Sequence, residues 1–191
     1  MGYKTMDANE AVSRVSYKFT EIAGIYPITP ASPMAEKVDV LASKGEINFW
    51  GNKVKVIEME SEKGAIATVH GALQAGVLAT TYTASQGLLL MIPSIYKMAG
   101  EMLPGVIHVA ARSLSTHSLS IFGDHQDIYA VRQTGACMLS SSSVEEAYHM
   151  AMVSHLASIK SSLPFINIFD GFRTSHEIDK VKEIDLSKLE T

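Results

Sequence analysis

The chain has 191 residues, of which 47% are hydrophobic and 19% charged, and its net charge at pH 7 is −4. This length and apolar content suit one globular domain and exclude a disordered chain. The acidic balance, with no run of three Lys or Arg residues, leads us to expect neither a nucleic-acid partner nor a membrane surface.

Apolar spacing predicts helices and strands that alternate along most of the chain. Asp7, three residues before Glu10, starts a first helix in the manner of a capping box. Further helices are predicted at 32–43, at 62–76, from Ser85 onward with a kink at Pro93, at 124–131 and at 143–159. Strands are predicted at 22–28, 54–58, 77–82, 106–111, 136–139 and 165–169.

This alternation predicts an α/β fold, a doubly wound and mostly parallel sheet of about six strands with helices on both faces. The strands are continuously apolar, as strands covered on both faces should be. We expect the domain to span residues 1–172. From Arg173 the pattern fades into charged residues with no new core element, so residues 173–191 are interpreted as a tail or a connector to a further domain.

The single cysteine, Cys137, excludes an internal disulfide and any iron–sulfur cluster ligated by this chain alone. It is typical of a reducing compartment, and we expect a cytoplasmic location. The longest apolar stretch, residues 88–93, is too short to span a bilayer. The charged fraction lies below the roughly 25% of an average domain, which indicates either surface covered by other protein or ordinary scatter.

Ligands of open parallel α/β sheets bind beyond the carboxyl ends of the strands, and this rule selects the turns that carry chemistry. Glu62 begins a helix, where the dipole favours a carboxylate, so it is either a ligand-facing group or a plain helix-end charge. Arg112 follows a buried strand and is either an anion clamp or half of an ordinary ion pair. Thr29 precedes Pro30 and could simply shape a turn.

Other kinds of site have weak support. The phosphate-binding patterns GxxxxGK[ST] and GxGxxG are absent, as is the GxSxG elbow of hydrolases. The helix start at 85–87 could bind an anion through free N–H groups, which is a weak signal alone. Asp124, His125 and Asp127 imitate a metal site, but they lack metal-ligand spacing, so we expect capping and surface positions and no metal ligand.

Six collinear segments together resemble the 2-oxoacid:ferredoxin oxidoreductases. They are YPITP at 26–30, ESE at 60–62, VHGA at 69–72, TASQGLLLM at 83–91, SIFGDHQDIY at 120–129 and FDGFRTSH at 169–176. The similarity covers nearly the whole chain. The TASQGLLLM and FGDHQDIY segments favour the pyruvate-oxidising members over the 2-oxoglutarate ones.

The resemblance implies a pyrimidine-binding thiamine diphosphate domain at the N-terminus of a much longer enzyme. That enzyme decarboxylates pyruvate oxidatively with coenzyme A and passes electrons to ferredoxin or flavodoxin. Its cofactors would be thiamine diphosphate with Mg²⁺, of which this chain carries a half-site, and [4Fe–4S] clusters, of which it carries none. The expected partners are the remaining domains, and we expect a homo-oligomer.

The resemblance also implies roles for particular residues. Glu62 would hydrogen-bond the aminopyrimidine ring and favour the imino tautomer that deprotonates the thiazolium. Arg112 would bind the pyruvate carboxylate, Thr29 would contact the substrate or the pyrimidine, and Pro30 would contact the cofactor. We expect the isolated chain to be inactive. The alternatives are a non-catalytic docking module, or the equivalent subunit of a 2-oxoglutarate or branched-chain 2-oxoacid enzyme.

Overall fold

A computed structural model describes residues 2–189 of the chain. Its main sheet has six parallel strands in the order β3-β2-β4-β5-β7-β6. These strands are β2 (Ile22–Ile25), β3 (Lys55–Glu58), β4 (Ala79–Thr83), β5 (Val106–Ala111), β6 (Cys137–Ser141) and β7 (Phe165–Asp170). The predicted α/β fold class is confirmed.

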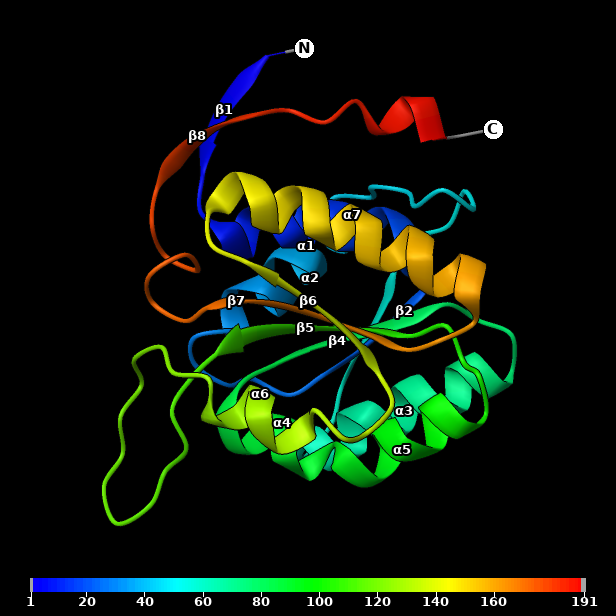
Figure 1. Cartoon of the computed structure of the whole chain (residues 1–191). Helices are drawn as coiled ribbons and strands as arrows, with labels where there is room; N and C mark the ends of the chain where they lie inside the picture. Colours follow the sequence, from blue (N-terminus) through cyan, green and yellow to red (C-terminus); the bar gives the residue numbers. More distant parts are fainter. Residues whose placement is uncertain (1, 190–191) are drawn as a thin grey trace.

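Helices cover both faces of this sheet (Figure 1). One layer consists of α1 (Ala8–Phe19), α2 (Ser32–Ser43) and α7 (Val144–Ser161), and the other of α3 (Glu62–Gln74), α4 (Ser85–Leu90), α5 (Ile92–Gly100) and α6 (Gln126–Val131). Each layer encloses its own apolar cluster against the sheet. Among residues 2–189, no helix is long and apolar enough to cross a bilayer.

Element boundaries follow the predictions, with two informative differences. The strand predicted at 22–28 ends at Ile25, because Pro27 and Pro30 cannot donate to a sheet ladder. The helix predicted to kink at Pro93 is instead two helices that meet at Met91, since a proline in the first turn of α5 suits a helix start better than a helix interior.

A short antiparallel pair, β1 (Tyr3–Met6) and β8 (Asp179–Lys182), joins the two ends of the chain. The expectation that no core element follows Arg173 is wrong, because Val181 of β8 is fully buried. Periodicity missed this pair, since each strand has four residues and buries only one of them. Whether residues 173–191 also connect to a further domain stays a prediction.

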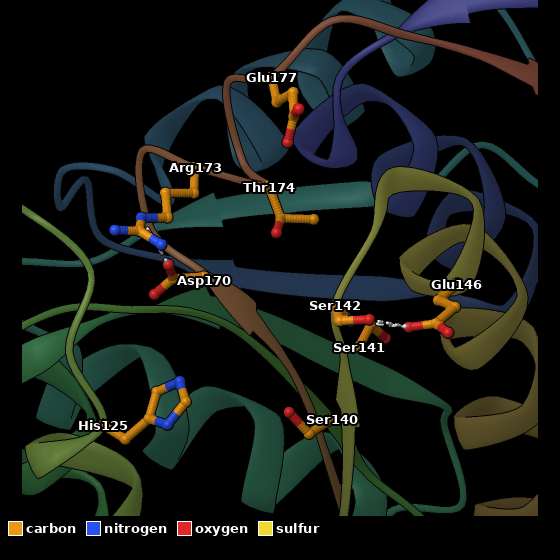
Figure 2. Close-up of a pocket in the computed structure, with 9 residues that line it drawn as sticks. All are labelled: His125, Ser140, Ser141, Ser142, Glu146, Asp170, Arg173, Thr174 and Glu177. Carbon is orange, nitrogen blue, oxygen red and sulfur yellow. Dashed lines mark hydrogen bonds and ion pairs between the residues drawn. The ribbon is translucent and has the colours of Figure 1, made fainter.

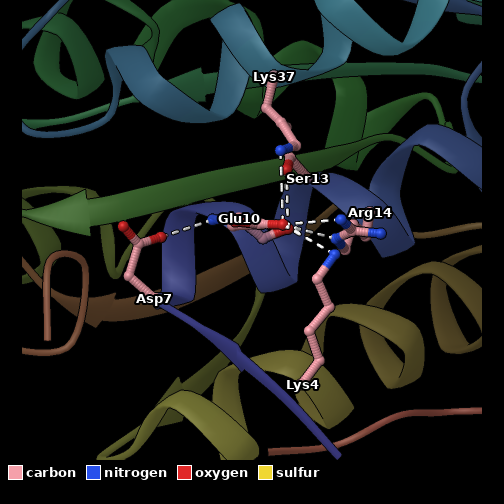
Figure 3. A network of polar contacts seen from close by, with 6 residues as sticks. All are labelled: Lys4, Asp7, Glu10, Ser13, Arg14 and Lys37. Atoms are coloured by element: carbon pink, nitrogen blue, oxygen red, sulfur yellow. Dashed lines mark hydrogen bonds and ion pairs between the residues drawn. The ribbon is translucent and has the colours of Figure 1, made fainter. Parts of the chain in front are cut away.

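The first turn of α1 gathers charge around one carboxylate (Figure 3). Asp7 caps the helix by accepting from the Glu10 N–H at 2.8 Å, which is half of the predicted capping box. The Glu10 side chain turns instead to Arg14 at 2.7 Å, Lys4 at 3.3 Å and Lys37 at 3.4 Å. Burial raises the pKa of Glu10, but these cations outweigh it and lower the pKa to about 2.

We expect Glu10→Gln to lower the free energy of unfolding at pH 7 by about 1 kcal/mol, a value that allows for solvent screening of partly exposed pairs. Because the folded-state pKa is lowered, this contribution is present above pH 4.5 and is lost as the pH falls toward 2. Urea unfolding at pH 7 measures it. Glu36→Gln on the exposed face of α2 is the matched control, and equal effects of the two substitutions would contradict the prediction.

Candidate functional site

Polar turns from five strands meet at one edge of the main sheet. Since β3, β2, β4, β5 and β7 are parallel neighbours, their carboxyl ends share that edge. Glu62 follows β3, Thr29 follows β2, Ser85 follows β4, Arg112 follows β5 and Asp170 ends β7. The structure thus brings the three residues singled out from the sequence to the edge where open α/β sheets bind ligands.

Glu62 is a nearly buried carboxylate at the first turn of α3, with 8% of its surface exposed. Ser61 caps the helix by accepting from the Gly64 N–H at 3.2 Å, which fixes where Glu62 stands. A Cβ at Gly87 would lie 2.9 Å from Glu62 Oε1, so the glycine lets α4 pack directly on this side chain. Within residues 2–189, no hydrogen bond or ion pair reaches the Glu62 carboxylate, which leaves it free for a ligand.

Arg112 lies across the edge from Glu62 and is 7% exposed. Its Nη1 donates to the Thr29 carbonyl at 2.7 Å, while its Nε has no hydrogen-bond partner among the described residues. Burial lowers the pKa of Arg112, against the opposing charges of Asp127 and Glu62. The guanidinium is therefore held in place at one nitrogen and keeps donor capacity for an anion.

Thr29 and Pro30 form the end of the β2 turn. The Thr29 side chain is exposed, while Pro30 is buried and its carbonyl accepts from Asn9 Nδ2 at 3.1 Å. A Cβ at Gly171 would lie 2.8 Å from Pro30 Cγ and 2.5 Å from a β5 carbonyl, so only glycine lets the chain pass here. Pro30 thus packs into the base of the site, and its contact with a cofactor stays a prediction.

Asp127 is a site residue that sequence reasoning missed. It was expected at the surface, but it is fully buried. Its Oδ2 accepts from the backbone N–H of Ser85 at 2.8 Å and of Arg112 at 3.0 Å, and its Oδ1 accepts from Ile128 at 2.8 Å. The available signal was helical spacing, because Asp127 lies four residues before the buried Val131 and so shares its face.

The start of α4 is not the anion site that the sequence suggested. The helix begins at Ser85, as predicted, with Ala84 at the N-cap position and a φ of 51° at Ser85. The Ser85 N–H already donates to Asp127, so the anion it meets belongs to the protein. Its hydroxyl donates to the Ser113 carbonyl at 2.6 Å, which ties α4 to the turn after β5.

A polar cavity of about 480 Å³ lies farther along the same edge, at the ends of β6 and β7 and the start of α7 (Figure 2). Its lining combines carboxylates, serines, a histidine and an arginine: His125, Ser140, Ser141, Ser142, Glu146, Asp170, Arg173, Thr174 and Glu177. The Ser142 N–H and hydroxyl both donate to Glu146 at 2.8 Å. Glu62, Arg112 and Thr29 are not among the residues that line this cavity.

Burial raises the pKa of Asp127, and this rise prevails over the three backbone hydrogen bonds that lower it.

In the described part of the chain, no three His, Cys, Asp or Glu side chains gather as a metal site requires. Asp124, which with His125 and Asp127 imitates a metal site in the sequence, is exposed and accepts from the Gln126 N–H at 2.8 Å. The two aspartates therefore differ in place, because Asp124 accepts a hydrogen bond at the surface and Asp127 accepts three inside the fold.

Residues 14–191 match the family model described as pyruvate flavodoxin/ferredoxin oxidoreductase, thiamine diphosphate-binding. The chain belongs to this thiamine diphosphate-binding domain family. The resemblance to the 2-oxoacid:ferredoxin oxidoreductases is thereby confirmed, as is the identification of the domain as a thiamine diphosphate-binding one.

Similar members of the family are much longer proteins. The chain is 60% identical over 188 residues to the pyruvate-flavodoxin oxidoreductase of Klebsiella pneumoniae, covering 98% of this chain and 16% of that protein. It is 58% identical over 192 residues to the pyruvate:ferredoxin oxidoreductase of Moorella thermoacetica, covering 99% of this chain and 16% of that protein. The chain therefore spans about one sixth of these relatives.

A solved structure shares the fold of this family member. It is described as the 2-oxoglutarate:ferredoxin oxidoreductase from Magnetococcus marinus with 2-oxoglutarate, coenzyme A and succinyl-CoA bound. The TM-score is 0.84 at 21% sequence identity, covering 98% of this chain and 32% of that chain. This likeness concerns the fold.

Proposed function

We propose that this domain supplies the pyrimidine side of a thiamine diphosphate site in an enzyme that oxidises pyruvate. The reaction converts pyruvate and coenzyme A into acetyl-CoA, CO₂, one proton and two electrons, and ferredoxin or flavodoxin accepts the electrons. Relatives that match nearly the whole chain carry the names of such enzymes. The observation that carries the proposal is the Glu62 carboxylate, which is nearly buried at this edge and has no hydrogen-bond partner among residues 2–189.

The residues fit the pyrimidine half of the cofactor. A nearly buried carboxylate is costly without a hydrogen bond, so Glu62 calls for a donor from outside the domain. A protonated aminopyrimidine ring nitrogen is such a donor, and Glu62 would hold that proton at its Oε atom. Gly87, with no side chain, lets the first turn of α4 pack on Glu62 and hold its carboxylate in position.

Arg112 would bind the carboxylate of the 2-oxo acid. Its side chain is almost fully buried, its Nη1 is anchored on the Thr29 carbonyl, and its Nε is unpartnered within the described residues. A substrate carboxylate that reaches the accessible part of this guanidinium would gain charge-assisted hydrogen bonds from a group that is already oriented. Thr29, exposed beside it, would contact the substrate or the pyrimidine.

The chemistry that thiamine diphosphate supplies when bound is a carbon nucleophile and an electron sink for decarboxylation. We propose that the diphosphate and Mg²⁺ are held by another domain, and that [4Fe–4S] clusters are ligated elsewhere, because this chain has one cysteine. A homo-oligomer and a cytoplasmic location are part of the same proposal.

The half-site makes a direct prediction about binding. Because the domain offers contacts to the pyrimidine side alone, we expect the isolated 191-residue chain to bind thiamine diphosphate weakly or not at all, and the full-length protein to bind it tightly. Isothermal titration calorimetry of both proteins with thiamine diphosphate and Mg²⁺ measures the difference. Micromolar affinity in the isolated domain would contradict the half-site.

Substrate profiling of the full-length protein tests the reaction itself. We expect coenzyme A-dependent CO₂ release and viologen reduction with pyruvate, and little with 2-oxoglutarate or branched-chain 2-oxo acids. Preference for 2-oxoglutarate would place the domain with the other branch of the family. No turnover with any 2-oxo acid would leave the docking-module alternative.

A further inference from the structure

We infer that Asp127 is a positioning residue that sets Arg112 for the substrate carboxylate by tying together the turns after β4 and β5. This inference rests on the proposed function, since it assigns Asp127 to the Arg112 that would bind the 2-oxo acid. Asp127 touches no reacting atom in this assignment and acts through backbone groups.

The hydrogen bonds of Asp127 begin where those of the sheet end. The last paired residues of β4 and β5 are Thr83 and Val109, and beyond them the two chains diverge. Ser85 and Arg112 lie past that point, and their N–H groups converge on the single Oδ2 atom of Asp127 at 2.8 and 3.0 Å. One buried carboxylate therefore joins the two strand ends where the ladder no longer does.

This connection fixes Arg112 at both ends. Asp127 holds its backbone N–H, and the Thr29 carbonyl holds Nη1 at 2.7 Å. A side chain with this many rotatable bonds is costly to immobilise, so two fixed points spare the substrate part of that cost. Released at the backbone, the guanidinium would sample positions that do not face Glu62.

The Asp127 carboxylate also supports Glu62 indirectly, through helix α4. Ser85, held by Asp127, begins α4, and Gly87 in the first turn of that helix packs against the Glu62 side chain. The Ser85 hydroxyl binds the Ser113 carbonyl, one residue after Arg112. The two sides of the candidate site thus share one support.

An amide at position 127 cannot replace the carboxylate. The two carboxylate oxygens of Asp127 accept hydrogen bonds from three backbone N–H groups, those of Ser85, Arg112 and Ile128. Asparagine has one acceptor oxygen, and its NH₂ group would face at least one of these donors. An unsatisfied buried N–H results, and the turns must shift to relieve it.

The test compares Asp127→Asn with Asp124→Asn in the full-length enzyme. Asp124 lies three residues earlier, is exposed and contacts neither Ser85 nor Arg112, so it is a matched control for the loss of a helix-start charge. We expect Asp127→Asn to raise KM for pyruvate about tenfold, the usual scale for loss of a residue that orients a ligand-binding group. KM for coenzyme A should stay unchanged, and Asp124→Asn should change neither.

A double substitution asks whether the effect passes through Arg112. In an Arg112→Ala background, where there is no guanidinium left to position, Asp127→Asn should add little further change in KM for pyruvate. An equal fold-change in both backgrounds would overturn the inference, as would a rise in KM for coenzyme A of the same size. Thermal unfolding midpoints of all variants are recorded alongside.

If Asp127→Asn does not fold, Asp127→Glu keeps the carboxylate and displaces it by one methylene. We expect this variant to fold and to raise KM for pyruvate by a smaller factor, and an unchanged KM would overturn the inference. Failure of the proposed function is separately visible, because the wild-type enzyme would then not oxidise pyruvate. A structure of the isolated Asp127→Glu domain then still shows whether Arg112 leaves the Thr29 carbonyl.

Discussion

Glu62→Gln in the full-length enzyme is expected to reduce pyruvate turnover by about 100-fold or more, the scale of a lost acid–base contact. The carboxylate would hold the proton of the aminopyrimidine ring, and the neutral amide would accept from it far more weakly. Stability should not fall with activity. Glu62 is 8% exposed and has no hydrogen-bond partner within residues 2–189, so relief of its desolvation offsets the lost attraction to the Arg112 charge.

The measurement therefore combines turnover, by viologen reduction, with urea unfolding of the isolated domain. Glu58→Gln, at the exposed end of β3 four residues earlier, is the control and should leave both unchanged. Lost activity with unchanged or increased stability supports the proposed function. Unchanged turnover in Glu62→Gln would favour the docking module instead, and a large loss of stability would show that Glu62 has an undetected structural partner.

Mild acid is expected to destabilise the isolated domain by about 4 kcal/mol between pH 7.5 and pH 5, through two buried histidines. His108 of β5 and His155 of α7 are almost fully buried, and their Nε2 atoms lie 3.1 Å apart. Aromatic rings enclose them, since Phe19 stacks on His155 and Tyr82 on His108. Protonation of both Nε2 atoms would set two N–H donors against each other in a dry core.

Burial lowers the pKa of His155 to about 3, and burial together with the charge of His155 lowers the pKa of His108 well below its usual value. At pH 7.5 both rings are almost entirely neutral in either state and contribute little pH dependence. As the pH falls below 6.5, the two histidines bind protons in the unfolded chain but stay neutral in the native state. The free energy of unfolding therefore declines until the pH reaches the pKa values of the histidines in the folded state. Each histidine accounts for about 2 kcal/mol at pH 5.

Urea unfolding of the isolated domain at half-unit intervals from pH 7.5 to pH 5 measures this decline. His155→Gln keeps a hydrogen-bonding group near His108 and should remove about half of the pH dependence. His117→Gln, on the exposed loop after β5, should leave the pH dependence as it is. A free energy of unfolding that is flat over this range would contradict the prediction.

Local pattern was enough to predict the architecture. The strand predicted at 106–111 coincides with β5, and the predicted helix over 32–43 coincides with α2. Hydrophobic period, helix caps and proline positions depend on residues a few places apart, and the order of helices and strands follows from them. The turns with Glu62, Arg112 and Thr29 could be assigned to one edge because all strands of a parallel sheet point the same way.

Partners far apart in the sequence were decided by the tertiary structure. The carboxylate of Asp127 reaches Ser85, 42 residues away, and His108 meets His155 across 47 residues. Neither pair has a local signature, because a buried aspartate or histidine looks like a surface one until strand order brings its partner near. The short strands β1 and β8 were not predicted for the same reason, because each forms only by pairing with the other, at the opposite end of the chain.

Composition thus determined a single low-charge domain with one cysteine, the alternation of helices and strands determined its α/β class, and the motifs determined its family. The tertiary structure decided which groups at the ligand edge are satisfied and which are free. The Asp127 carboxylate accepts three N–H donors and serves the fold, whereas the Glu62 carboxylate has no hydrogen-bond donor among the described residues. The physical reason is that hydrogen-bond satisfaction depends on distance in space, which strand order sets and local sequence does not.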